Sequence, residues 1–504
     1  MGNSIIVSTG SLYEQATDYE DADKRLTISR TYRSMPGSDV GSFPVLPIPF
    51  GLGDLWRLNF QWDLELGSYF PYVGNFGIST PDGSNYGFTL STNGSVAANN
   101  NGVNDISIQF VNPGGGEVSY SNILSNGGQF LITTSGGDQI LIGLFVPYYS
   151  TQYIAGRPLQ ITYRGGYIWT FNYGSQGEVD SITDNLGRTI SLSWYYAAVL
   201  GTSTQYPLAI QTITMPDGTA LNYTYESYTG TQGGNGGYAR LKAFTRTHGG
   251  TVADSASYLY SSSVSPALLT GVVDNAGVQF NTWQYDAYGH VVYESHPNGA
   301  DAVNVAYSLD PSGLYAYRTV TNALGLQTSY TFETVWGYDP GLISVVGAPT
   351  SNCLGTTTTL GYDNNARITS RTDSLGNITQ YTYGTDGRVQ SRTEAYGTAV
   401  QRTTSYTWND TFGVPTQIVK SGLTSNLTYD ATGRLTQRQE LDTTTQTSPY
   451  STHGQTRTWT YGYNSAGLLS SVNGPLAGNQ ILYSYSSNGY RSSTTNALGQ
   501  VELA

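Results

Sequence analysis

The chain has 504 residues, and only 11% of them are charged, which excludes a disordered polyampholyte. Its net charge of −13 argues against a nucleic-acid-binding protein, because phosphate contacts need clusters of Lys and Arg and no basic run occurs. The single cysteine, Cys353, excludes an intrachain disulfide and a cysteine-based metal cluster. The longest apolar stretches fall far below the roughly 20 residues of a spanning helix, so we expect no membrane span.

The N-terminal segment, residues 1–66, does not repeat. Met1–Gly10 lacks the basic start and apolar run of a signal peptide, and Ile6 stands where N-myristoylation would need Ser or Thr. Alternation along Leu26–Thr31 predicts a strand. Residues 67–164 are rich in strand and turn signals but irregular, and we interpret them as degenerate repeats rather than a separate small domain.

Residues 165–504 repeat a β-hairpin of about 21 residues. The clearest copy, Asp373–Thr393, has a turn at Asp373–Gly376, an alternating run that ends in Tyr-x-Tyr, and a second turn at Gly384–Gly387. The anchor aromatics of successive copies lie 21, 25, 21, 34 and 22 residues apart by subtraction; they are Tyr362, Tyr383, Trp408, Tyr429, Tyr463 and Tyr485. Helical spacing with caps is nearly absent. We therefore predict an all-β fold of stacked hairpins, in which Tyr381 and Tyr383 lie beside their counterparts in other repeats.

The turns supply the candidate structural residues. Gly at a turn tip can take the positive φ of a tight reversal, and Asp can cap the turn through its side chain. These residues are Asp184, Gly187, Asp286, Gly289, Gly325, Asp373, Gly376, Gly387, Arg388, Asp430, Gly433, Arg434 and Gly499.

The pattern Tyr-Asp-x-x-Gly-Arg-Leu-Thr at Tyr429–Thr436, with Asp-x-Leu-Gly-Asn-x-Thr at Asp373–Thr379, resembles the YD repeat of Rhs proteins. The chain is similar to bacterial Rhs polymorphic toxins, to the cocoon components of insecticidal Tc toxins and, more distantly, to teneurins. Residues 1–66 resemble the segment that opens many Rhs repeat regions. The resemblance implies a spiral sheet that closes into a hollow shell, export to the cell surface or medium, and an enclosed C-terminal toxin or effector that is absent here.

The same family commonly ends its shell with an Asp-Pro-x-Gly motif beside a self-cleavage site. Asp310–Gly313 matches those four residues, but more repeats follow it and the downstream pattern is missing, so we interpret it as a repeat turn. The last repeat opens at Leu498–Gly499 and is not closed. We therefore expect a fragment or truncated protein, with an open C-terminal strand edge that can recruit further strands.

No catalytic or metal-binding pattern stands out. Four histidines lack ligand spacing: His248, His290, His296 and His453. An acidic cluster lacks the spacing of an EF-hand: Asp18, Glu20, Asp21 and Asp23. We expect no enzyme activity, no cofactor and no metal.

Three functions remain open at this point. The first is a structural shell segment that carries an effector. The second is a surface adhesion or carbohydrate-binding array, because exposed Tyr and Trp stack on sugar rings. The third is an enzyme acting on polysaccharides, for which paired carboxylates would be needed, although turn capping accounts for the acidic residues.

Overall fold

The computed structural model describes residues 4–21, 24–34, 51–53, 55–66, 74–99, 106–115, 118, 123–146, 154–198, 205–228, 238–335, 339–349, 355–448, 451–487 and 489–503. These residues form 39 strands and one short 3-10 turn, η1 (Pro297–Gly299), without an α-helix. The predicted all-β fold is confirmed. No helix among the described residues is long and apolar enough to cross a membrane.

The first four strands form a separate antiparallel sheet in the order β1-β2-β3-β4. We call it the N-terminal sheet; its strands are β1 (Ile5–Ile6), β2 (Ser11–Glu20), β3 (Thr27–Arg33) and β4 (Trp56–Leu58).

The remaining strands form one long antiparallel ribbon, which branches at β12. The first half of β12 pairs with both β5 and β11, and its second half pairs with β11 and β13. The strands up to the branch are β5 (Asp63–Leu66), β6 (Asn75–Ser79), β7 (Asn85–Leu90), β8 (Val96–Ala98), β9 (Ile106–Val111), β10 (Gln129–Thr134), β11 (Gln139–Phe145) and β12 (Ile154–Tyr163).

From β13 onward each strand pairs with the next, as expected for consecutive hairpins. We call the first part, β13 to β24, the covered arc. Its strands are β13 (Tyr167–Tyr173), β14 (Val179–Asp184), β15 (Thr189–Ala198), β16 (Gln205–Thr214), β17 (Ala220–Tyr228), β18 (Tyr238–His248), β19 (Thr251–Leu259), β20 (Gly271–Val273), β21 (Gln279–Tyr285), β22 (Val291–Ser295), β23 (Val303–Leu309) and β24 (Tyr315–Thr321).

We call the second part, β25 to β39, the open arc. Its strands are β25 (Gln327–Val335), β26 (Asp339–Gly347), β27 (Thr356–Tyr362), β28 (Ile368–Thr372), β29 (Ile378–Tyr383), β30 (Val389–Glu394), β31 (Arg402–Asn409), β32 (Val414–Lys420), β33 (Leu423–Tyr429), β34 (Leu435–Asp442), β35 (Thr456–Tyr463), β36 (Leu469–Asn473), β37 (Gln480–Tyr485), β38 (Arg491–Thr495) and β39 (Val501–Leu503).

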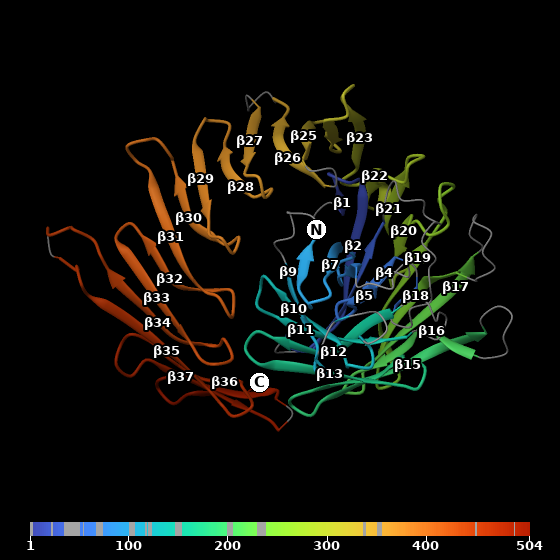
Figure 1. The fold of residues 1–504 in the computed structure, drawn as a ribbon, viewed down its shortest axis with the longest axis horizontal. Helices are drawn as coiled ribbons and strands as arrows, with labels where there is room; N and C mark the ends of the chain where they lie inside the picture. Colours follow the sequence, from blue (N-terminus) through green and yellow to red (C-terminus); the bar gives the residue numbers. More distant parts are fainter. Residues whose placement is uncertain are drawn as a thin grey trace.

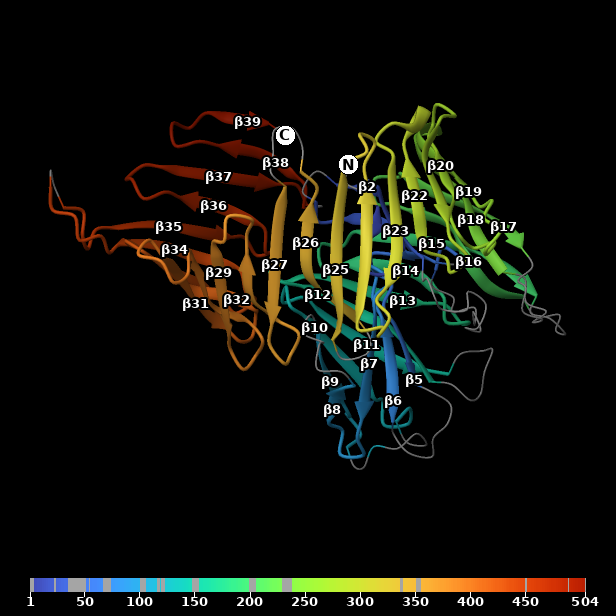
Figure 2. The same cartoon turned by 90° about the horizontal axis from the view of Figure 1, so that it is seen from above.

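The ribbon curls around the N-terminal sheet. In Figure 1 the N-terminal strands lie against the green and yellow strands of the covered arc, whereas the orange strands of the open arc form the opposite side of the ring. Figure 2 shows the same molecule from above, with β6, β8 and β9 at one end and β38 and β39 at the other. The ribbon is therefore a spiral of hairpins rather than a flat sheet, as the accumulated twist of paired strands would produce.

Side chains alternate between the two faces of the ribbon, so the strand registers assign each residue to a face. We call the face that carries Trp283, Val305 and Phe332 the inner face, because Trp283 on that face donates a hydrogen bond to Ser4 beside β1 at 3.1 Å. The hydrophobic core is one continuous cluster that joins the N-terminal sheet, the segment from β5 to β12 and the inner face of the covered arc. Beyond Phe332, the only buried hydrophobic side chains among the described residues are Val414 and Leu468.

Candidate functional site

Several hairpins are closed by a turn in which one aspartate side chain accepts hydrogen bonds from the residues that follow it. Asp430 Oδ1 accepts the backbone N–H groups of Thr432 and Arg434 at 2.9 and 3.0 Å, and its Oδ2 accepts Arg434 Nε at 2.6 Å. Burial disfavours the charged carboxylate, but the hydrogen bonds from Arg434 and Thr432 outweigh it and lower the pKa of Asp430. The Asp-x-x-Gly-Arg sequence therefore folds its own turn.

The same geometry recurs at Asp184 with Arg188, where the Oδ2–Nε distance is 2.7 Å, and at Asp363 with Arg367, where it is 2.8 Å. His290 replaces the arginine at Asp286 and lies 2.8 Å from its Oδ2.

The predicted turn residues occupy these and related turns. Asp373 accepts the N–H groups of Leu375 and Asn377 at 2.9 Å each. Arg388 pairs at 3.0 Å with Asp386, two residues before it, instead of with a residue four places earlier. The turn glycines have φ between 77° and 82°; they are Gly187, Gly289, Gly325, Gly376, Gly387, Gly433 and Gly499.

An aromatic anchor precedes each turn and ties the hairpin to the one before it. The Tyr383 hydroxyl donates to the carbonyl of Ile368 at 2.6 Å, and Tyr429 and Tyr485 do the same to Pro415 and Leu469. Trp408 uses its indole N–H on the carbonyl of Val389 at 2.7 Å. Each of these anchors lies at a register shift in its strand pair, so the bulge aims the ring at its target.

The arginine of a turn then stacks on the anchor tyrosine of the following hairpin. The Arg367 guanidinium lies 4.8 Å from the Tyr383 ring centre, and Arg434 lies 4.7 Å from that of Tyr463. In the covered arc His290 stacks on Tyr307 at 4.7 Å. One repeat is thus linked to the next by both a hydrogen bond and a ring contact.

The expected contact between Tyr381 and the tyrosines of other repeats is wrong. The residue directly opposite Tyr381 is Arg392 on β30, because the equivalent strand of the next repeat is two strands away. On the inner face Tyr381 therefore lies opposite a cation rather than beside another aromatic ring.

The late part of the ribbon rests on the early part along a seam of turns. The N–H of Gly165 donates to the carbonyl of Thr432 at 3.1 Å. A Cβ at Gly489 would lie 2.6 Å from Leu186 Cδ1, and one at Gly413 would lie 2.9 Å from the carbonyl oxygen of Ser135. Three late turns thus meet three early turns, and the ribbon closes one revolution on itself.

The N-terminal sheet is locked to the inner face by buried charges. Arg30, 2% exposed, forms an ion pair with Asp18 at 2.8 Å, and Asp18 also accepts the Tyr223 hydroxyl at 2.8 Å. Asp21 forms an ion pair at 2.9 Å with Arg188 of the ribbon. The acidic cluster therefore contributes two of its members to docking; Glu20 forms an ion pair with Lys24 at 3.2 Å, and Asp23 lies outside the described residues.

A second contact joins β1 and its turn to β21 and β22. Glu294 accepts the Ser4 hydroxyl at 2.8 Å, and Gly10 accepts the N–H of Val291 at 2.9 Å. Glu14 on β2 is mostly buried, and burial, with the nearby Glu294 charge, raises its pKa to about 7. No sequence pattern marks these contacts, because they join segments more than 150 residues apart.

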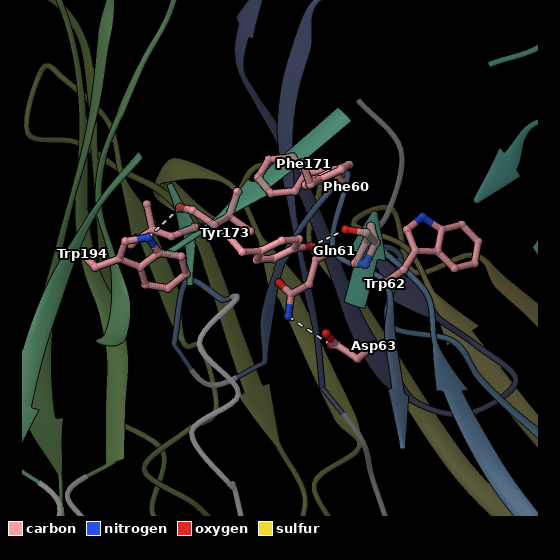
Figure 3. Close-up of a pocket in the computed structure, with 10 residues that line it drawn as sticks. Phe60, Gln61, Trp62, Asp63, Phe171, Tyr173 and Trp194 are labelled. Carbon is pink, nitrogen blue, oxygen red and sulfur yellow. Dashed lines mark hydrogen bonds between the residues drawn. The ribbon is translucent and has the colours of Figure 1, made fainter. Parts of the chain in front are cut away.

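A small pocket lies where the N-terminal segment meets β13 and β15. Figure 3 shows it, lined by Phe60, Gln61, Trp62, Asp63, Phe171, Tyr173 and Trp194. Its free volume of about 10 Å³ admits a water molecule and no larger ligand. We interpret it as a packing gap of the core.

The other candidate residues have structural surroundings. His290 and His296 lie in turn regions, and His248 contacts Thr219 at 3.0 Å. Asp310 caps its own turn by accepting the N–H groups of Ser312 and Tyr315 at 3.1 and 2.8 Å. In the described part of the chain, no three His, Cys, Asp or Glu side chains converge as metal ligands would. Cys353 lies outside the described residues.

Comparison with known proteins finds a similarity in the last part of the chain. Residues 346–504 match the family model described as Teneurin YD-shell. No curated protein matches the chain.

Among solved structures, the crystal structure of TcdB2-TccC3-TEV aligns with 94% of this chain and 22% of its own, at 13% identity and a TM-score of 0.38. The Photorhabdus luminescens Tc holotoxin pore aligns with 83% and 25%, at 11% identity and a TM-score of 0.27. The N-terminal domain of effector protein SpvB from Salmonella typhimurium aligns with 70% and 95%, at 15% identity and a TM-score of 0.17. The chain spans about a fifth of the length of the TcdB2-TccC3-TEV chain.

Proposed function

We propose that this chain, whose residues 346–504 match the Teneurin YD-shell family model, is a structural part of a shell that encloses a polypeptide cargo. The observation that carries the proposal is that the inner face is covered by a second layer in the covered arc and is uncovered in the open arc. The seam closes the ribbon into a ring, and the inner face of the open arc has almost no buried side chain within that ring. A ring that leaves part of its lining uncovered has room for a second polypeptide.

The cargo we propose is a toxin or effector, and the role we propose for this chain is non-enzymatic. Both rest on the resemblance to Rhs proteins and on the YD-shell match. The same resemblance supports export to the cell surface or medium.

The test is protection of a cargo from protease. A small reporter domain fused after Ala504 should resist a protease that digests the free reporter, and density for it should lie inside the ring in a single-particle map. A matched fusion with Gly137→Val should lose protection, because a Cβ there would collide with the backbone carbonyl oxygen of Phe412 at the seam. A reporter digested at the same rate in the intact fusion as when free would exclude enclosure.

A further inference from the structure

The charges of the open arc are distributed unequally between its two faces. Between β27 and β37 every charged strand residue has inner-face parity by register, since Leu360 faces Arg371, Tyr381 faces Arg392 and Trp459 faces Arg438. The cations of this face are Arg371, Arg392, Arg402, Lys420, Arg438 and Arg457. The carboxylates on it are Glu394, Glu440 and, at the end of β34, Asp442. In a chain of net charge −13, this face is basic.

The outer face of the same strands carries no charge and is mostly Thr, Ser, Gln and Asn, with a few aliphatic side chains such as Val419 and Leu482. Its side chains bond to one another: Thr382 lies 2.6 Å from Ser391, Thr393 lies 2.9 Å from Thr403, and Gln417 donates to Asn426 at 3.0 Å. Solubility alone would place the charges on the outer face, so their position on the inner face requires another explanation.

Two of the six inner cations form ion pairs: Arg392 with Glu394 at 2.7 Å, and Arg438 with Glu440. Arg371 interacts electrostatically with Asp373. The side chains of Arg402, Lys420 and Arg457 are exposed and form no ion pair or hydrogen bond with the described residues, although Glu394 and Glu440 lie opposite Arg402 and Arg457 in the register. Aromatic rings lie between them on the same face, among them Tyr406, Trp459 and Tyr461.

The covered arc shows what such a face accepts. Its inner face is occupied by the N-terminal sheet. Asp21, just after β2, forms an ion pair with Arg188, and Trp56 and Tyr32 donate hydrogen bonds to the ribbon. In the open arc, charge complementarity with the exposed cations favours an acidic occupant that also brings aromatic or aliphatic side chains.

We propose that the inner face of the open arc binds an acidic polypeptide that also carries aromatic or aliphatic side chains. This inference rests on the proposed function and names the chemistry of the cargo. In this complex the carboxylates of the cargo pair with Arg402, Lys420 and Arg457, and its apolar side chains pack against the Tyr and Trp rings of the same face. Nucleic acid would use the cations but would be repelled by Glu394, Glu440 and the net negative charge of the chain.

The experiment compares two triple variants of the full chain that change the net charge equally. The inner variant is Arg402→Gln, Lys420→Gln and Arg457→Gln. The outer variant is Thr403→Glu, Val419→Glu and Thr456→Glu, which alters the adjacent, exposed residue of each strand on the opposite face. The probe is a fluorescent random copolymer of glutamate and tyrosine, and anisotropy gives its affinity.

We expect the inner variant to bind the copolymer about 10-fold more weakly, the effect of three exposed charge contacts of ordinary strength. The outer variant should stay within about 2-fold of the parent chain, since it leaves these contacts in place. Circular dichroism checks that both variants are folded. Equal losses in the two variants, or no binding by the parent chain, would overturn the inference.

Two competitors test the chemistry of the partner. Pure polyglutamate should compete poorly. If it competed as well as the unlabelled copolymer, the aromatic rings of the inner face would have no role in binding. Single-stranded RNA should not compete, and if it did the face would be a nucleic-acid site instead. If fused reporters of either charge are protected equally from protease, the shell function stands and the charge preference is wrong.

Discussion

The covered and open arcs are built from the same repeat but are stabilised differently. Tyr285 in the covered arc and Tyr383 in the open arc make the same hydroxyl bond to the preceding hairpin, at 2.5 and 2.6 Å. Around Tyr285 lies a hydrophobic core with Trp283 and Val291, whereas no side chain of β29 is buried. The difference shows that links between neighbouring hairpins hold the ribbon, and that burial is added only where a second layer lies on it.

The largest expected effect compares two tryptophans on the inner face. Trp283 is 1% exposed in the covered arc, and Trp459 is half-buried in the open arc. Trp283→Ala should lower the free energy of unfolding by about 3–5 kcal/mol, because it leaves a cavity. Trp459→Ala should cost about 1 kcal/mol, in proportion to the smaller area it buries. Urea titration of both variants measures the difference; equal losses would mean that the open arc has a core of its own.

The second prediction concerns pH and the docking of the N-terminal sheet. A carboxyl whose pKa is raised in the folded state lowers stability as pH rises from its unfolded value of 4.5 to about 7, and the full penalty applies above pH 7. For Glu14 this range corresponds to about 3 kcal/mol. Glu14→Gln should remove that loss.

The difference between the free energies of unfolding at pH 5 and pH 8, measured by denaturant titration, should therefore be smaller for the Glu14→Gln variant than for the parent chain. Glu294 and Arg30 interact electrostatically with Glu14. We change Glu14 itself because a substitution at Glu294 or Arg30 would also remove their bonds to Ser4 and Asp18. An unchanged pH dependence would show that Glu14 stays ionised where the N-terminal sheet meets the covered arc.

The third prediction compares two turn glycines of the open arc. Gly433 has φ of 81°, and a Cβ there would lie 2.8 Å from the ring of Phe412; Gly376 has φ of 80° and open space around it. Gly376→Val should cost about 1 kcal/mol or more through backbone strain alone. Gly433→Val should cost about 1–3 kcal/mol, because strain and collision add. Thermal melts that match the parent chain would contradict both.

The smallest effect compares the two anchor hydroxyls. Tyr285→Phe leaves a carbonyl without its donor next to the core, and it should cost about 1–2 kcal/mol. Tyr383→Phe leaves a carbonyl that water can reach, and it should cost about 0.5 kcal/mol. Chemical denaturation resolves the two, and a larger loss for Tyr383→Phe would reverse the assignment of the two arcs.

The repeat could be predicted from the sequence because its interactions are local. Asp430 and Arg434 are four residues apart, and Tyr383 reaches a carbonyl 15 residues back. The bond between Ser4 and Glu294 spans 290 residues, and no period in the chain marks either partner. The inner face lies between these cases: register fixes which side chains share a face, but only the N-terminal sheet shows which face is inside.

The seam fixes the number of hairpins in one revolution of the ring. Late turns contact early turns at the seam. Adding or deleting one hairpin would therefore displace every later turn by two strand spacings, about 9.6 Å, and the turn glycines would lose their contacts with the early turns. Extra residues in a connection have no such effect. The long connection between β34 and β35, which spaces Tyr429 and Tyr463 by 34 residues, leaves at the edge away from the seam, and the Tyr463 hydroxyl still reaches the carbonyl of Leu435 at 2.9 Å. Chains with this architecture should therefore tolerate loops of any length. Their number of repeats should change only by the number that fills a whole revolution.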